Sequence, residues 1–125
     1  MNKQTEKVRR YQAARVRLPN IVLTTVDRAN LDACIVRHGT TAEAVKCAVA
    51  HLIERYAGGG EAESQPTPGE STGVQLQSIF MPVHYAEAWR IVSHDCGSDR
   101  AALRQALHEY ATHITKAPKQ LDLLR

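Results

Sequence analysis

The 125-residue chain has few aromatic residues, with one Trp, one Phe and four Tyr, and it has only three cysteines. Cys34, Cys47 and Cys96 are odd in number and scattered, so no disulfide framework is expected, and a reducing cytoplasm is the simplest setting. No apolar run is long enough to cross a bilayer, and the first residues lack the pattern of a signal peptide. The sequence therefore predicts a cytoplasmic protein with no membrane partner.

Motifs for catalysis and metal binding are also missing. The sequence has no phosphate-binding loop, no Gly-x-Ser-x-Gly and no acidic cluster, and its six histidines form no metal-ligand spacing. His108 and His113 are five residues apart and point to different faces of a helix, while His94 and Cys96 come nearest to a ligand pair. Surface or partly buried histidine is the commoner interpretation, so we expect no enzyme, no metal and no cofactor.

The chain does contain one pattern twice, and a repeat changes the expected fold. A shift of 58 places Gly39 on Gly97 and Thr40 on Ser98. Glycine ends a preceding helix by entering the left-handed conformation, and Thr or Ser caps the next helix. Thr40 and Glu43 also have the spacing of a capping box. Apolar residues then follow at helical spacing and predict a helix with one buried side: Ala44, Val45, Ala48, Val49 and Leu52, then Ala102, Leu103, Ala106, Leu107 and Tyr110.

A second helix precedes each glycine, and a strand precedes each of these helices. The helices are predicted at Val26–His38 and Val83–Cys96, which align with a shift of 57 and imply one residue inserted before the second glycine. Thr25 and Pro82 are their start signals. The strands are predicted over 20–25 and 75–81, because both segments are rich in β-branched or aromatic residues.

A lone strand cannot satisfy its backbone N–H and C=O groups, so the two strands are expected to pair with each other as an antiparallel ribbon above four helices. This order of strand, helix, Gly-Thr/Ser and helix resembles the ribbon-helix-helix superfamily of Arc-, MetJ- and CopG-like DNA-binding proteins. Both copies lie on one chain, which is similar to the tandem TraY proteins. The resemblance implies a mainly α fold with a short two-stranded antiparallel ribbon, built as β-α-α-linker-β-α-α into an intramolecular pseudo-dimer.

The expected organisation has five parts. Residues 1–14 form a flexible basic arm, because the first 17 residues hold six Lys or Arg and one acid, Glu6; a solvated tail that keeps the protein soluble is the alternative. The first repeat covers 15–56 and the second 74–114. A Gly-, Pro- and Ser-rich linker at 57–73 joins them. A tail at 115–125 follows, with a break in the helix at Pro118.

The resemblance further implies sequence-specific binding to double-stranded DNA, with repression of a small operon as the leading role and self-association on DNA as a possibility. Two alternatives stay open. The first is an accessory DNA-binding protein of plasmid transfer, acting in a relaxosome. The second is a protein–protein interaction module of the antitoxin or inhibitor type.

Because strand residues alternate sides, Ile21 and Leu23 are expected to face the core. The opposite phase would read base edges in the major groove, and Ile79 and Met81 belong to it in the second strand. A register slip of one would instead expose Ser78 and Phe80. Simple packing of one or both strands is a further alternative. The predicted base contacts are Asn20, Val22, Thr24, Gln75 and Gln77.

Phosphate contacts are expected at the starts of the two Gly-capped helices, where free N–H groups and the positive end of the helix dipole attract anions. Plain helix capping explains the same residues without DNA, and the two roles are compatible. Basic residues just before the first strand extend the set. The predicted phosphate contacts are Arg15, Arg17, Thr40, Thr41, Ser98 and Arg100.

If the arm neutralises phosphates, the logarithm of the affinity for DNA should fall with the logarithm of salt concentration by about 0.9 per contact. Deleting residues 1–14 removes Lys3, Lys7, Arg9 and Arg10 and should flatten that slope. The measurement is a salt titration of binding by the full chain and by the shortened one. An unchanged slope would mean that the arm serves only solubility.

Overall fold

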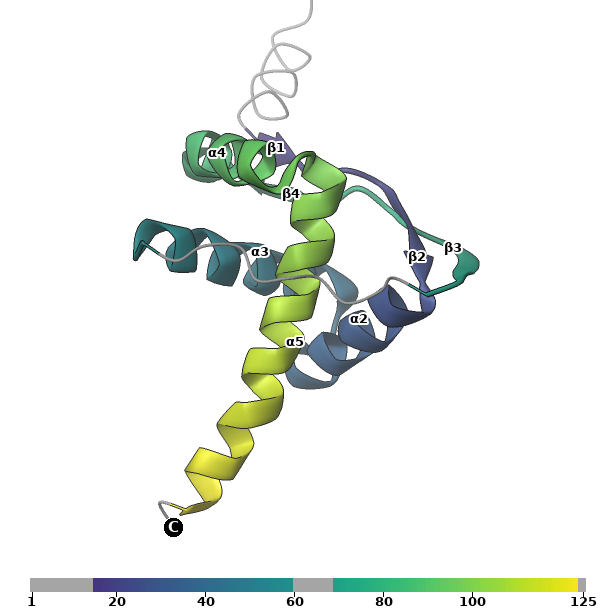
Figure 1. Cartoon of the computed structure of the whole chain (residues 1–125), viewed down its shortest axis with the longest axis vertical. Helices are drawn as coiled ribbons and strands as arrows, with labels where there is room; N and C mark the ends of the chain where they lie inside the picture. Colours follow the sequence, from purple (N-terminus) through teal and green to yellow (C-terminus); the bar gives the residue numbers. More distant parts are fainter. Residues whose placement is uncertain (1–14, 60–68, 124–125) are drawn as a thin grey trace, which may run out of the picture.

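The structure, a computed structural model, describes residues 15–59 and 69–123, with side chains described as far as residue 115. The predicted arm at 1–14 and most of the predicted linker lie outside these residues. The described chain is mainly helical with short antiparallel strands (Figure 1). None of its described helices is long and apolar enough to cross a membrane. The elements in chain order are β1 (Arg15–Arg17), β2 (Ile21–Thr24), α2 (Thr25–His38), α3 (Thr41–Ala57), β3 (Ser71–Leu76), β4 (Phe80–Pro82), the 3₁₀ turn η1 (Val83–Tyr85), α4 (Ala86–Cys96) and α5 (Asp99–Leu123).

The four strands form two separate antiparallel sheets, β1 with β4 and β2 with β3. The predicted pairing of the two halves of the chain is confirmed at Ile21↔Leu76 and its neighbour Val22↔Gln75. The predicted single ribbon is wrong, because the pairing is interrupted at its centre. Pro19 has no N–H to donate there. The sequence also did not predict β1, nor that β3 begins at Ser71, inside the expected linker.

Side-chain faces on the strands agree with expectation in the first half of the chain and at Gln75 and Gln77 in the second, but differ at Met81. Ile21 and Leu23 are each 2% exposed, as predicted. Met81 was expected to face outward and is 2% exposed, whereas Phe80 is 39% exposed. The side of the sheet that each residue faces changes because the strand is interrupted between Leu76 and Phe80. The alternation of inward and outward side chains holds only within a continuous strand.

The helix boundaries follow the predicted glycine and hydroxyl pattern. Gly39 and Gly97 have φ of 87° and 99°, a region in which a side chain is strained, and each ends a helix. Thr40 and Ser98 accept hydrogen bonds from backbone N–H groups three residues ahead. The N-cap of α2 is Thr24 rather than Thr25, and it forms a complete capping box with Asp27.

The first helical stretch of each half begins and ends at one constant spacing. Thr25 and Val83 are the first residues of α2 and η1, and they are 58 positions apart. The same spacing separates His38 from Cys96, the last residues of α2 and α4. It equals the spacing of the two capping glycines, so the expected insertion before the second glycine is wrong.

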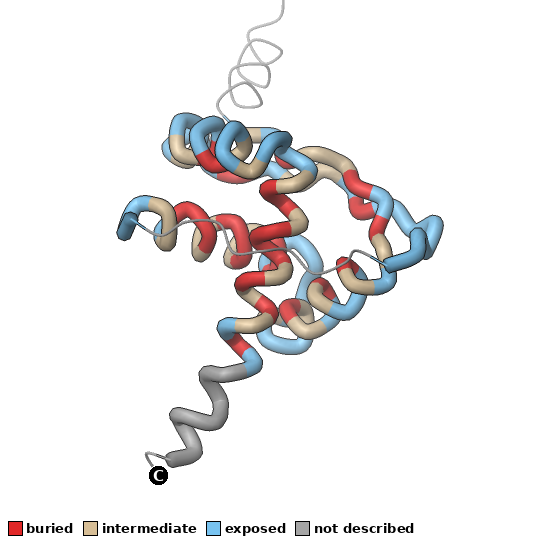
Figure 2. Tube along the Cα trace, in the orientation of Figure 1, coloured by how far each residue is buried: buried red, intermediate tan, exposed pale blue. Residues whose placement is uncertain are grey.

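The core lies where α5 crosses the other helices, and α5 contacts α2, α3 and α4. The predicted apolar stripes of α3 and α5 are buried here, from Ala44 to Leu52 and from Ala102 to Leu107 (Figure 2). Leu18, Ile21 and Met81 cover this core from the strands. Helix α5 continues to Leu123, so the predicted break at Pro118 is wrong; proline in a helix interior costs about 3 kcal/mol but does not forbid the helix.

One buried carboxylate joins α3 to α5. Glu109 is 5% exposed and accepts a hydrogen bond from Arg55 Nη2 at 2.9 Å. Gln105 Nε2 donates to the same carboxylate at 2.5 Å. A buried charge is tolerated when it is paired and hydrogen-bonded, so these two donors explain why Glu109 can lie in the helix interface.

Rings from three helices meet beside this pair. The His51 ring lies 4.6 Å from that of His113 and 5.4 Å from that of Tyr110, measured between centroids. The Tyr110 hydroxyl is 2.6 Å from His38 Nε2. Burial lowers the pKa of His51 below its ordinary 6.5, and His113 lowers it further, while Glu109 opposes the shift. The folded state therefore favours neutral His51.

Because the pKa of His51 is lower in the folded state, its contribution to stability is complete above pH 6.5 and is lost as pH falls below that value. We expect the melting temperature to drop between about pH 7.5 and pH 5.5, and His51→Gln to reduce that drop. Thermal melts followed by circular dichroism measure it. His84→Gln, at an exposed histidine outside the cluster, is the control. A drop of the same size in His51→Gln would contradict the assignment.

Candidate nucleic-acid interface

The outer face of the two sheets gathers polar and basic side chains. The inward residues Leu18, Ile21 and Leu76 are buried in the core, so the opposite side of the strands is exposed to solvent. Five exposed residues of this face are predicted site residues: Arg15, Arg17, Val22, Gln75 and Gln77. Phe80 is also exposed on it.

Side chains from both strands and from α5 meet at the centre of this face. Arg17 Nε donates to Ser78 Oγ at 3.1 Å, and Ser78 Oγ donates to Asn20 Oδ1. Arg100 Nε, from the first turn of α5, donates to the backbone oxygen of Asn20 at 3.1 Å. The structure thus brings together three predicted site residues, Arg17, Asn20 and Arg100.

An open pocket of about 370 Å³ lies at this junction. Its two guanidinium groups and the start of α5 favour an anion, since helix N-termini present free N–H groups. Asp99 also lines it and opposes that attraction. The lining residues are Arg17, Leu18, Pro19, Asn20, Ser78, Asp99 and Arg100.

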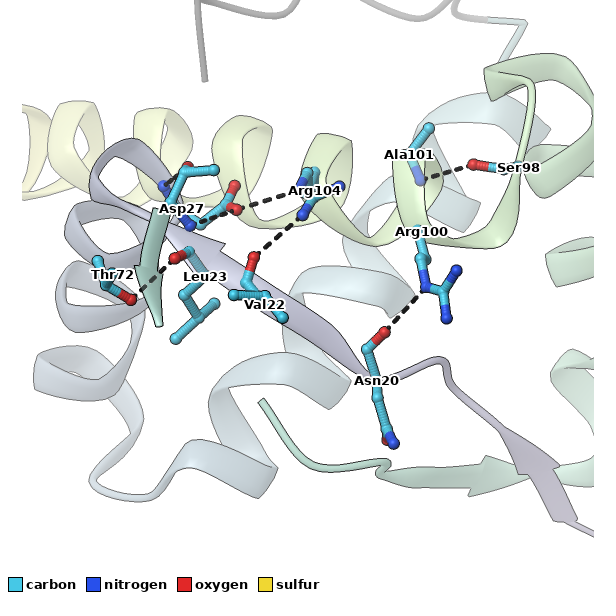
Figure 3. A network of polar contacts seen from close by, with 10 residues as sticks. Asn20, Val22, Leu23, Asp27, Thr72, Ser98, Arg100, Ala101 and Arg104 are labelled. Carbon is cyan, nitrogen blue, oxygen red and sulfur yellow. Dashed lines mark hydrogen bonds and ion pairs between the residues drawn. The ribbon is translucent and has the colours of Figure 1, made fainter. Parts of the chain in front are cut away.

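Two arginines of α5 cover the outer edge of β2 (Figure 3). Arg100 reaches the oxygen of Asn20, and Arg104 Nη2 donates to the oxygen of Val22 at 3.1 Å. Arg104 Nε also pairs at 3.0 Å with Asp27, whose carboxylate accepts from Thr24 N. Unpaired strand edges invite further pairing, so these arginines both satisfy the edge and tie β2 to α5.

The remaining predicted site residues have structural roles that the geometry makes visible. Thr24 Oγ1 accepts a hydrogen bond from Asp27 N at 3.1 Å. The hydroxyl that was predicted to contact a base is therefore engaged in capping α2. Thr40 caps α3 through Glu43 N, and Ser98 caps α5 through Ala101 N. Thr40 and the exposed Thr41 lie at the turn between α2 and α3 and do not line the central pocket.

Sequence reasoning missed Ser78 and Arg104. Ser78 fell in the phase assigned to the core, although the one-residue slip considered for the ribbon would have exposed it. Arg104 lies 58 positions after Lys46, so the repeat indicates a shared basic position, but it does not indicate what Arg104 contacts. Both contacts join residues far apart in sequence, 61 positions for Arg17 with Ser78 and 82 for Arg104 with Val22.

The helical interior offers no activated nucleophile among the cysteines. Burial raises the pKa of Cys34 to about 11, and it also raises the pKa of Cys47 and of Cys96. Their thiols stay protonated at neutral pH, which is opposite to what thiolate chemistry requires. Within residues 15–59 and 69–115, no three His, Cys, Asp or Glu side chains form a group suited to a metal ion.

No protein-family model matches the sequence, no curated protein resembles it significantly, and no solved structure matches its fold significantly. The arrangement described above is therefore interpreted from its own geometry.

Thr24→Ala should destabilise the protein by about 1 kcal/mol, because it removes the N-cap hydroxyl of α2. Thermal or urea unfolding measures the change. Thr25→Ala is the matched control, since Thr25 is an exposed first helical residue and is expected to change stability by less than half as much. Equal losses for the two variants would mean that the capping box of Thr24 contributes little.

Proposed function

We propose that the chain is a tandem ribbon-helix-helix protein that binds double-stranded DNA sequence-specifically and represses transcription of a small operon. The two sheets act as two halves of one ribbon that enters the major groove. The starts of α3 and α5 contact phosphates on either side of it. No chemical step and no cofactor are required.

The register of the two sheets supports a single interrupted ribbon. Arg17 pairs with Phe80 in one sheet, and Ile21 pairs with Leu76 in the other. The two pairs are four positions apart on both strands, so the two sheets share one register here. Between them, Leu18 N donates to Ile79 O at 2.8 Å, which continues the pairing toward the gap. Residues 15–24 and 71–82 therefore run antiparallel, with a short break between the sheets and a register shift between Val22 and Thr24.

The constant spacing of the elements supports two copies of one unit. The turn before α3 and the turn before α5 have the same glycine and the same capping chemistry, at positions 58 apart. Each unit supplies one strand segment and two helices. A unit of about 40 residues is at the lower size limit for a stable core, so joining two units lets both bury their apolar faces.

The observation that carries the proposal is the exposed face of the paired strands. Arg15, Arg17, Gln75 and Gln77 all point to solvent from a two-stranded element of the kind that fits a major groove. Arginine and glutamine pair bidentately with guanine and adenine respectively. Exposed Arg and Gln would also suit a plain solvated face, but the same face carries the exposed Val22 and Phe80. Apolar side chains can contact thymine methyl groups, so the mixture of polar and apolar side chains supports base reading.

Binding alone would suffice for the repressor role, because a protein bound at a promoter excludes polymerase without any chemical reaction. Arg100, which lines the pocket beside the ribbon, would contact a phosphate there, while Arg17, which lines the same pocket, would reach a base edge. Arg100 is already held against Asn20, so this contact would be preorganised. Transfer accessory and antitoxin roles use the same fold, and no described residue favours them over repression.

Gln75→Ala should lower the preference for the cognate duplex over a scrambled one by about 5-fold or more, since a good base contact contributes roughly 1–3 kcal/mol of discrimination. Fluorescence anisotropy measures the affinity of full-length protein for duplexes from its own upstream region and for scrambled versions, at two salt concentrations. Repression is then read from a reporter under that upstream region.

Asn30→Ala, an amide removed from α2 rather than from the ribbon, is the matched control and should leave the ratio unchanged. Thermal melts confirm that both variants fold. A folded wild-type protein that binds no duplex, at either salt concentration, would overturn the proposal. The protein–protein interaction module would then become the better hypothesis.

A further inference from the structure

We infer, on the basis of the proposed DNA binding, that the DNA partner is a non-palindromic site with one guanine-bearing half and one A·T half. The β1–β4 sheet reads the guanine half through Arg15 and Arg17. The β2–β3 sheet reads the A·T half through Gln75 with Val22. A chain that carries both ribbon halves can differ between them, whereas identical subunits present identical halves.

Corresponding positions in the two sheets follow from the register and the spacing of 58. A two-fold rotation that exchanges the two units exchanges β1–β4 with β3–β2. Under it, Arg17 corresponds to Gln75. Arg15 corresponds to Gly73 by the spacing alone, because the pairing of β2 with β3 shifts register between Val22 and Thr24. Two inward pairs obey the same relation: Leu18 with Leu76, and Leu23 with Met81, all of them buried. These core positions keep a correspondence that the outer face has lost.

The β1–β4 half is cationic on its outer face, where the exposed Phe80 lies opposite Arg17. Arg15 and Arg17 are both exposed, and the contact with Ser78 holds Arg17 through one nitrogen of a guanidinium that has five N–H donors. Arginine with two donors toward O6 and N7 of guanine is the commonest specific base contact in the major groove. A neighbouring hydroxyl that fixes Nε preorganises the side chain for such a contact.

The β2–β3 half is neutral on its outer face. Val22, 46% exposed, lies opposite the exposed Gln75 in the pairing of the two strands. Glutamine matches the donor and acceptor of adenine, and an apolar side chain contacts the thymine methyl. An adenine and its paired thymine methyl lie side by side in one groove, so this cross-strand pair suits A·T steps.

The arginines of α5 do not remove the difference in charge between the two outer faces. Arg104 is committed to Asp27 and to the Val22 carbonyl, and Arg100 is committed to the Asn20 carbonyl. The bonds to the Asn20 and Val22 carbonyls engage the backbone along the edge of this strand segment, rather than the side chains of its outer face. The difference between the two outer faces is therefore not cancelled by cations from the helices.

Selection of binding sites from a pool of random-sequence duplexes tests this inference with the full chain. The expected result is a motif without two-fold symmetry, guanine in one half and A·T pairs in the other. Enrichment of a palindromic motif would overturn the inference while supporting the proposed DNA binding. Absence of binding to every duplex would overturn the proposed function, and the inference with it.

Arg17→Gln makes the corresponding side chains at 17 and 75 the same. It should reduce affinity for the selected motif by about 10-fold or more, and change the preferred base in the guanine half toward adenine while the other half stays unchanged. Arg28→Gln, at an exposed arginine on α2 paired with Asp32, is the control with the same charge change. Equal weakening on all sequences, selected and scrambled, would make Arg17 a phosphate contact and overturn its guanine-reading role.

Discussion

Backbone pairing between residues 15–24 and 71–82 is the interaction on which the rest of the structure depends. Strands of three to six residues cannot satisfy their N–H and C=O groups alone, and the helices cannot bury their apolar faces without a cover. Pairing fixes where α2 and η1 begin, because each follows its strand without a gap. It also presents Ile21, Leu23 and Met81 together as that cover. The arginines of α5 then secure the outer edge of β2 from the helical side.

The helices could be predicted closely because their signals are local. A glycine with positive φ, a hydroxyl cap and apolar residues at helical spacing all lie within a few residues of one another, and the stripe from Ala102 to Leu107 is buried as expected. The end of α5 could not be predicted in this way, since Pro118 disfavours a helix without excluding it.

The strands and the candidate site were harder to predict because they depend on contacts between distant residues. Three exposed residues, Val22, Gln75 and Gln77, were expected to face outward and do so. The predicted outward orientation of Met81 was wrong, because the break between the two sheets depends on how the paired segments meet. Thr24 was expected to face outward, but its hydroxyl caps α2. Neither the contact of Ser78 with Asn20 nor that of Arg104 with β2 has a local sequence signal.

Having both paired strands on one chain also changes how the face they form responds to dilution. When two identical chains must associate to build such a face, the assembled fraction falls as protein becomes scarce. Here the partner strand is always present at the effective concentration set by the connecting chain, in the millimolar range for short flexible connections. The paired face therefore exists even in a single molecule. At low abundance, the fraction of a binding partner that is occupied is therefore proportional to the number of protein molecules. For a dissociating dimer it would fall with the square of that number.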